Sequence, residues 1–258
     1  MGKTKLGLPL EYQKLPEYFD AHNIGEDTEL KNSVIERLLK KHQIKTVLDL
    51  TCGTGSQVFY LKKHNYEVTG ADLSPQLLTI ARDRATKEKL DTKFIAGDMR
   101  TLKVGEFDAV ITIFNAIGHL TKPGFEKAIR NIHKNLKTGG IYIFDIFNLK
   151  ALTDQVIENF AMHTQKKVKD TTVHSMQCST IDRIKGLLTS YDTYMIQKNA
   201  GKPEIFNNKF QLQIYTSQEL KEMLIKNGFR VLNRYGMNGE EFIEDKTLNM
   251  LTVSKKDD

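Results

Sequence analysis

The chain has 258 residues, of which 40% are hydrophobic, and a formal net charge of +6. This size predicts one globular domain carrying an insertion rather than two independent domains. No apolar run approaches the roughly 20 residues that a bilayer requires, and the first ten residues lack the apolar core of a signal peptide, so we expect a cytoplasmic protein with no membrane partner. The two cysteines, Cys52 and Cys178, predict neither a disulfide framework nor a metal site.

The chain begins with an aromatic segment at residues 8–20. Tyr12 lies before Pro16, and Tyr18 and Phe19 follow it. These rings either line a binding site or anchor the segment to the core, and the sequence leaves both interpretations open. Residues 28–42 come next, and their apolar residues recur with a helical period, so we expect a helix that covers one face of a sheet.

The most informative stretch is a strand, a glycine turn, a helix and a second strand. An apolar run at residues 46–50 leads into a turn with Gly53 and Gly55, and a second apolar run ends at Asp72. Asp72 follows Gly55 by 17 positions. In a βαβ unit this spacing places a carboxylate at the tip of the neighbouring strand, where it can accept hydrogen bonds from both hydroxyls of a ribose. The stretch therefore predicts a nucleoside site.

The residues that are missing narrow the choice of nucleoside. A dinucleotide-binding loop needs a third glycine where this chain has Val58, and no Gly-Lys-Ser/Thr follows the glycines as a phosphate-binding Walker loop requires. An adenosine ligand without a pyrophosphate remains. This points to S-adenosylmethionine.

The motif Asp-Leu-Thr-Cys-Gly-Thr-Gly at residues 49–55 resembles the first motif of class I S-adenosylmethionine-dependent methyltransferases, with Asp72 in place of their ribose-binding acid. Three later segments resemble further motifs of that family in the same order: Ala-Gly-Asp-Met-Arg at 96–100, the strand-like run at 107–113 with the loop after it, and the Gly-Gly pair that ends 136–140. The resemblance implies S-adenosylmethionine as the cofactor and S-adenosylhomocysteine as its product.

The resemblance also implies which residues hold the cofactor. Asp98 corresponds to the acid that meets the adenine amino group, and the segment with Tyr12 and Tyr18 corresponds to a lid over the site. Leu73 is placed to lie against the adenine, and Cys52 is a small residue where the backbone approaches the ligand. The expected cofactor-binding residues are Tyr12, Asp49, Thr51, Cys52, Gly53, Gly55, Asp72, Leu73, Asp98, Met99, Phe114 and Asn115.

His119 and Tyr18 are the candidate catalytic residues. His119 follows the predicted fourth strand at its carboxyl end, and an imidazole can change its charge near pH 7. A sulfonium methyl group is already activated, however, and its in-line displacement needs chiefly the alignment of donor and acceptor. A general base is therefore optional, and a structural histidine bonded within the loop is the alternative interpretation.

The pattern changes after residue 148. Alternating segments at 171–181, 186–197 and 204–214 predict antiparallel strands, and Thr216-Ser-Gln-Glu219 predicts a capping box that begins the last helix. The expected fold is α/β: a Rossmann-like seven-stranded methyltransferase sheet with helices on both faces, plus an antiparallel β insertion between the fifth strand and the last helix.

We expect three parts in this fold. Residues 1–44 form a lid segment and a helix. Residues 45–148 and 216–258 form the S-adenosylmethionine-binding domain, and residues 149–215 form an inserted subdomain that covers the substrate.

The order of elements also resembles small-molecule N-methyltransferases such as glycine N-methyltransferase and those acting on aminosugars, which implies transfer to a nitrogen or oxygen of a small acceptor. Residues 161–203 carry seven Lys and Arg against three Asp, which favours an anionic acceptor if these side chains line the site and carries no information if they face solvent. An amine is also compatible. An RNA methyltransferase and a non-catalytic cofactor-binding protein are the alternatives, but the chain has neither an RNA-methylation motif nor a damaged glycine loop, so we expect no nucleic-acid partner.

Overall fold

A seven-stranded sheet forms the centre of the molecule. The computed structural model describes residues 6–257. The strand order is β10-β11-β5-β4-β1-β2-β3, and β11 runs antiparallel to both of its neighbours while the β5-β4-β1-β2-β3 pairs are parallel. The strands are β1 (Thr46–Asp49), β2 (Glu67–Asp72), β3 (Lys93–Ala96), β4 (Phe107–Thr112), β5 (Leu136–Phe147), β10 (Phe229–Tyr235) and β11 (Asn249–Lys256). The predicted Rossmann-like fold class is confirmed.

Helices cover both faces of this sheet. The buried sides of α2, α3 and α4 pack with one set of strand residues that includes Val47 and Ile143, and those of α5 and α7 pack with the alternate set that includes Leu48 and Phe144. Successive strand residues point to opposite faces, so each strand contributes to two cores. The helices are α2 (Thr28–Lys41), α3 (Ser56–Lys63), α4 (Pro75–Glu88), α5 (Lys122–Lys134) and α7 (Ser217–Lys226). No helix within residues 6–257 is both long and apolar enough to cross a membrane.

Polar side chains fix where several of these helices begin. The Ser74 hydroxyl accepts a hydrogen bond from the Leu77 N–H at the start of α4. Thr216 and Glu219 exchange the two reciprocal bonds of a capping box at the start of α7, as the sequence predicts.

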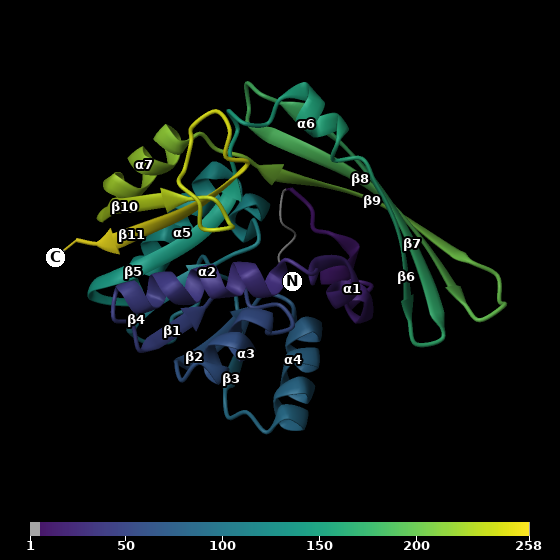
Figure 1. The fold of residues 1–258 in the computed structure, drawn as a ribbon, viewed down its shortest axis with the longest axis horizontal. Coiled ribbons are helices and arrows are strands. Elements are labelled where there is room, and N and C mark those ends of the chain that lie inside the picture. The colour runs from purple at the N-terminus through teal and green to yellow at the C-terminus, as the bar shows by residue number, and fades with distance from the viewer. Residues whose placement is uncertain (1–5, 258) are drawn as a thin grey trace.

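The insertion forms a second sheet of four antiparallel strands in the order β6-β7-β8-β9. Its elements are α6 (Asp154–Glu158), β6 (Met162–Val168), β7 (Thr171–Asp182), β8 (Leu187–Lys198) and β9 (Glu204–Gln213). Figure 1 shows this long, twisted sheet arching away from the central sheet, with the N-terminal segment between the two. That segment contains two short 3₁₀ turns, η1 (Leu10–Tyr12) and η2 (Pro16–Tyr18), and helix α1 (Phe19–Asn23).

Strand β6 was not predicted. It pairs with β7 alone and so forms an edge of the sheet, and most of its residues are exposed. An exposed edge strand does not need alternating apolar residues, so it gives no periodic signal in the sequence.

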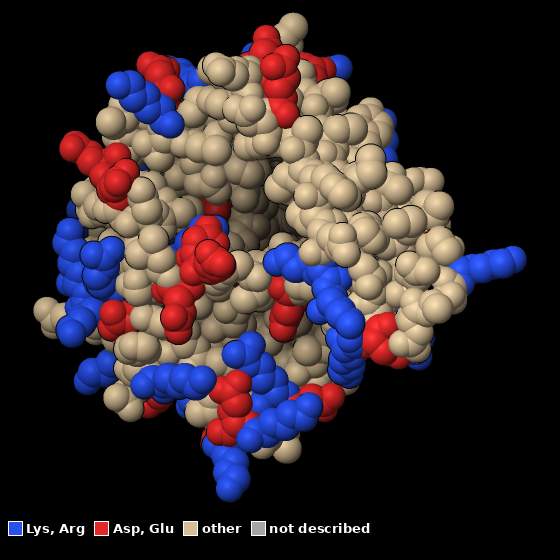
Figure 2. All heavy atoms as spheres, turned by 45° about the vertical axis from the view of Figure 1, so that its right-hand side comes forward, with Lys and Arg blue, Asp and Glu red and all other residues tan. Residues whose placement is uncertain are grey.

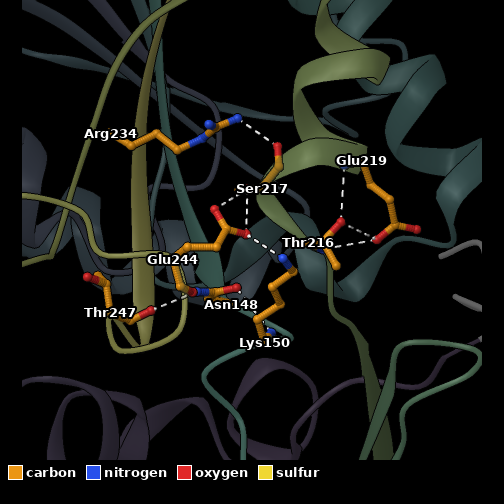
Figure 3. A network of polar contacts seen from close by, with 8 residues as sticks. All are labelled: Asn148, Lys150, Thr216, Ser217, Glu219, Arg234, Glu244 and Thr247. Atoms are coloured by element: carbon orange, nitrogen blue, oxygen red, sulfur yellow. Dashed lines mark hydrogen bonds and ion pairs between the residues drawn. The ribbon is translucent and has the colours of Figure 1, made fainter.

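The insertion is fastened where it leaves and re-enters the central fold (Figure 3). Asn148, at the exit, donates from its side chain to the carbonyl oxygens of Glu244 and Thr247 in the β10–β11 connection. Ser217, just after the return, donates its hydroxyl to the Glu244 carboxylate, with an oxygen–oxygen distance of 2.6 Å. Asn148 also forms a parallel bridge with Tyr215. One loop therefore holds both ends of the insertion together.

Phe125 on α5 provides a test of the core that supports this arrangement. It is fully buried, and its ring centroid lies 5.8 Å from that of Phe144 on β5 and 5.6 Å from that of Tyr215 at the return of the insertion. Phe125→Ala should lower the free energy of unfolding in urea by about 3–5 kcal/mol because it leaves a cavity. Ile184→Ala, at a side chain that is 98% exposed, is the control and should change it by less than about 0.5 kcal/mol.

Candidate functional site

A cavity of about 390 Å³ lies at the carboxyl ends of the parallel strands. In an open α/β sheet this edge is the usual position of a ligand crevice, and the volume is within the range of small-molecule sites. The space-filling view shows a deep hollow between the central fold and the inserted sheet, with mostly uncharged walls and charged side chains on the surface around it (Figure 2). Eleven of the predicted site residues line the cavity: Tyr12, Asp49, Thr51, Cys52, Gly53, Asp72, Leu73, Asp98, Met99, Phe114 and His119.

The glycine turn after β1 forms the base of the cavity. Gly53 has a φ of +53°, and a Cβ on this residue would lie 3.0 Å from the Phe19 ring, which packs on the turn from the N-terminal segment. Gly55 has a φ of +91° and precedes the first residue of α3. Both positions therefore require glycine. Gly55 itself does not line the cavity, so it contributes only to the conformation of the turn.

Two buried carboxyl groups lie beside this turn. Asp72, at the end of β2, accepts hydrogen bonds from the backbone N–H groups of Gly53 at 2.9 Å and Ser74 at 2.8 Å. Asp49, at the end of β1, accepts one from the N–H of Thr51. Burial raises the pKa of Asp72 and raises that of Asp49 to about 7. Neither carboxyl has a cationic side-chain partner within residues 6–257, so both can accept hydrogen bonds from a ligand.

Asp98 follows β3 on the far side of the cavity from β1. Its carboxylate accepts from the Nε of Arg100 at 2.9 Å and from the backbone N–H of the same residue. Burial raises the pKa of Asp98, but the bonds from Arg100 outweigh it, and the pKa lies below its usual value. Asp98 is thus a carboxylate at neutral pH, with Leu73 and Met99 as apolar neighbours in the cavity wall.

His119 lies at the end of the short turn η3 (Ala116–His119), on the side of the cavity nearest the insertion. Its ring centroid is 5.6 Å from that of Tyr12 and 6.0 Å from that of Phe210 on β9. Its Nδ1 is buried without a hydrogen-bond partner among residues 6–257. Burial lowers the pKa of His119 to about 4, so the ring is neutral at physiological pH.

Besides Gly55, two predicted residues do not line the cavity, namely Tyr18 and Asn115. Tyr18 packs instead against Val173 and Tyr194 of the inserted sheet, which matches the anchoring alternative. The Asn115 side chain is turned toward β5, where its Oδ1 accepts a hydrogen bond from the N–H of Phe147 at 2.9 Å.

The cavity also contains residues that the sequence analysis did not single out. Gln57 on α3 is 2% exposed, and both polar atoms of its side chain lack a partner in the described part of the chain. Its position just after the glycine turn could have identified it from the sequence as a candidate site residue. Asn23 of α1 also lines the cavity, as does Phe19, one of the rings for which both interpretations were open, and Asp20 accepts a 2.6 Å hydrogen bond from the Thr54 hydroxyl. This contact spans 34 positions, and no local pattern indicates it.

The N-terminal segment separates the inserted sheet from the cavity. None of the lining residues comes from 149–215. The inserted sheet instead binds the outer side of the segment: the Tyr194 hydroxyl donates to Glu11 at 3.0 Å, and the Asn208 side chain donates to the Leu8 carbonyl oxygen at 3.1 Å. The segment is therefore held by the sheet on one side and by the glycine turn on the other.

Two buried acids lie where the inserted sheet meets this segment, Asp192 on β8 and Glu11 on the segment itself. Asp192 is 4% exposed, accepts from Gln177 at 2.8 Å and leaves its Oδ2 without a partner within residues 6–257. Burial raises the pKa values of Asp192 and Glu11, and the Asp192 charge raises that of Glu11 further. All seven Lys and Arg residues of 161–203 are exposed. The excess positive charge of the insertion therefore lies on its surface.

Residues 47–140 match the family model of a methyltransferase domain. The chain is similar to a glycine/sarcosine N-methyltransferase of Parasynechococcus marenigrum, with 36% identity over 46% of this chain and 43% of the relative. Among solved structures, it resembles an S-adenosylmethionine-dependent methyltransferase from Clostridium acetobutylicum with a TM-score of 0.78 and 18% identity, covering 96% of this chain and 99% of the other. It also resembles a sugar N-methyltransferase from Streptoalloteichus with a TM-score of 0.77 and 18% identity, covering 92% and 91%. At these identities the two structures establish the fold.

The depressed pKa of His119 predicts a pH dependence of stability. Below pH 6.5 the unfolded chain takes up a proton on this residue, whereas the folded protein does so only near pH 4. His119 therefore lowers the free energy of unfolding as the pH falls through this window, by up to about 3 kcal/mol. Other groups titrate in the same window, so we expect denaturant titrations at pH 7 and pH 4 to show this amount as the difference between the parent and His119→Phe, with the parent losing more. His163→Phe on the exposed strand β6 is the control, and an unchanged pH dependence in His119→Phe would contradict the assignment.

Proposed function

Because the chain carries a methyltransferase domain within the fold of the S-adenosylmethionine-dependent enzymes, we propose that it methylates a nitrogen of a small molecule. S-adenosylmethionine is the cofactor. The observation that carries the proposal is the cavity, which brings the glycine turn, Asp72 and Asp98 together from the ends of three neighbouring strands. This is the set of groups that an adenosine ligand without a pyrophosphate needs.

The lining residues fit this cofactor. In the proposed complex Asp72 holds the ribose hydroxyls and Asp98 the adenine amino group, with Leu73 and Met99 on the faces of the ring. Asp49 and Gln57 have free hydrogen-bonding capacity beside the glycine turn, where the polar amino-acid end of the cofactor would lie. When bound, S-adenosylmethionine supplies an activated methyl group.

The protein's main contribution to the reaction is alignment. In-line displacement requires the donor and acceptor to be held at the correct distance and angle, which is worth up to roughly 7–11 kcal/mol. Tyr12 and His119 line the side of the cavity at which an acceptor would bind. The neutral His119 ring has an unpartnered Nδ1 that can orient an amine or accept its proton, although a pKa of about 4 makes it a weak base.

The charges near the N-terminal segment support an amine as the acceptor. Glu11 and Asp192 are buried without a Lys or Arg partner in residues 6–257, and the only side chains that lower the pKa of Asp192 are the neutral amides of Gln177 and Asn208. Buried carboxyl groups of this kind are stabilised by a cation, such as a protonated amine, that enters when the segment opens. The lysines that suggested an anionic acceptor are exposed. We therefore propose that residues 149–215 cover the acceptor indirectly, by holding the N-terminal segment in place. Because this segment covers the cavity, RNA is the less favoured acceptor.

Asp72 provides the test of the cofactor site. Asp72→Asn removes a charged hydrogen-bond acceptor from the cavity and should weaken S-adenosylhomocysteine binding by roughly 1.5–3 kcal/mol in isothermal titration. Asp83→Asn, the same change at an exposed position on α4, should leave binding unchanged. NAD should give no binding heat with the parent protein. Binding of NAD without binding of S-adenosylhomocysteine would refute the cofactor assignment.

Asp192 provides the test of the acceptor class. We expect methyl transfer to members of a panel of amines, including glycine and aminosugar nucleotides, and none to simple carboxylates or to an RNA transcript. Asp192→Asn should raise KM for the amine about tenfold or more, the range for hydrogen bonds to a charge, without changing S-adenosylhomocysteine affinity. Asp170→Asn, at an exposed turn of the same sheet, is the matched control. Transfer to RNA or carboxylates with no turnover of amines would reverse the acceptor assignment.

A further inference from the structure

The loop after β4 contains two consecutive residues in the left-handed backbone region. Phe114 has a φ of +63° and Asn115 a φ of +58°. A bulky side chain such as that of Phe114 rarely adopts this conformation, which strains the backbone, whereas asparagine tolerates it. Such a conformation persists only where surrounding groups impose it.

Asp145, near the end of β5, is the side chain that imposes it. Its two carboxylate oxygens lie 3.3 and 3.2 Å from the backbone nitrogen of Asn115, which donates to them. The Asn249 side chain of β11 also donates to Asp145 at 3.5 Å. Asn115 supports the same turn because its Oδ1 accepts a hydrogen bond from the N–H of Phe147. Asn115 thus fixes the turn to β5 at two positions, Asp145 and Phe147.

These hydrogen bonds to the turn fix the position of the Phe114 ring. Phe114 lines the cavity, whereas Asp145 is 1% exposed and does not. The Lys31 ammonium of α2 lies 5.9 Å from the centre of the Phe114 ring and supports it from α2. Asp145 therefore reaches the cavity only through the conformation of Phe114.

We infer that Asp145 is a positioning residue, which holds the turn of Phe114 and Asn115 in its left-handed form and so fixes the aromatic wall of the cofactor cavity. This inference rests on the proposed function, because it assigns Asp145 a role in the same site. It adds a residue that no motif in the sequence indicates and that contacts neither reactant.

The electrostatic surroundings of Asp145 predict that its positioning role depends on pH. Burial raises its pKa to about 6, while the N–H groups of Asn115 and Phe114, the Asn249 side chain and the Lys31 charge act in the opposite direction. Within residues 6–257, Lys31 of α2 is the one side chain whose charge acts on Asp145, and the Asp145 charge in turn helps to raise the pKa of Tyr142 on β5, which keeps that phenol neutral. Protonation of the carboxylate weakens its hydrogen bonds to the turn, so the bracing is strongest well above about pH 6 and declines as the pH falls through that value.

The test measures S-adenosylhomocysteine affinity by isothermal titration in Asp145→Asn. At pH 8 we expect about tenfold weaker binding than in the parent, since release of one strained residue is worth about 1.4 kcal/mol. At about pH 5 the ratio of the two affinities should approach one, because the parent carboxylate is then protonated. Other titrating groups in the cavity affect both proteins equally and cancel in this ratio.

Two further variants show whether Asp145 acts through Phe114. Phe114→Ala should weaken binding by itself, and adding Asp145→Asn to it should change the affinity little, because the two changes remove the same wall. Ser254→Ala is the control: this buried hydroxyl donates to the Tyr142 carbonyl oxygen on the same strand as Asp145, so its loss perturbs β5 without touching the turn.

Each outcome separates the two proposals. If the parent does not bind S-adenosylhomocysteine, the proposed function is overturned. If the parent binds it and Asp145→Asn behaves like Ser254→Ala, or if its effect is independent of pH and adds fully to that of Phe114→Ala, the positioning role is overturned. Should Asp145→Asn fail to fold, the parent is compared with Phe114→Ala across the same pH range, and identical pH profiles would refute the role.

Discussion

The carboxylate of Asp72 is the constraint on which the site depends. It is buried at the end of β2 and compensated by backbone N–H groups rather than by a cation. One of these bonds fixes the glycine turn after β1, and the other fixes the chain just before α4. A single side chain thus aligns the ends of two strands and the beginning of a helix, and the cavity exists because these three segments meet there.

The central part of the fold is readable from the sequence because its signals are local. Glycines with positive φ, helix caps at Ser74 and Thr216, and apolar strand runs each act within a few residues, and all of them occur where the structure places them. Strand β6 was not predicted because an exposed edge strand does not need alternating apolar residues. The residues of the glycine turn and of the ends of β2 and β3 line the cavity because the carboxyl ends of neighbouring parallel strands meet at one edge of the sheet.

The less predictable parts of the site depend on contacts between distant segments. Tyr18 and Tyr12 are equivalent in the sequence, but the inserted sheet takes up Tyr18 and leaves Tyr12 facing the cavity. Asn115 follows a strand, as a ligand-binding residue would, yet its side chain supports the backbone of β5. The bonds from Thr54 to Asp20 and from Asn115 to Asp145 join residues about 30 positions apart. Such pairings follow from the folded arrangement and leave no periodic trace.

The inserted sheet touches the N-terminal segment, and the segment in turn touches the cavity. The two contact surfaces of the segment are formed by different residues, Glu11 toward the sheet and Asp20 toward the glycine turn. Substitutions on the inner face of β7, β8 and β9 can therefore accumulate without replacing any residue that lines the cavity. Under the proposed function, this layered construction would allow a lineage to acquire new acceptors by varying one sheet while the methyl donor site stays the same.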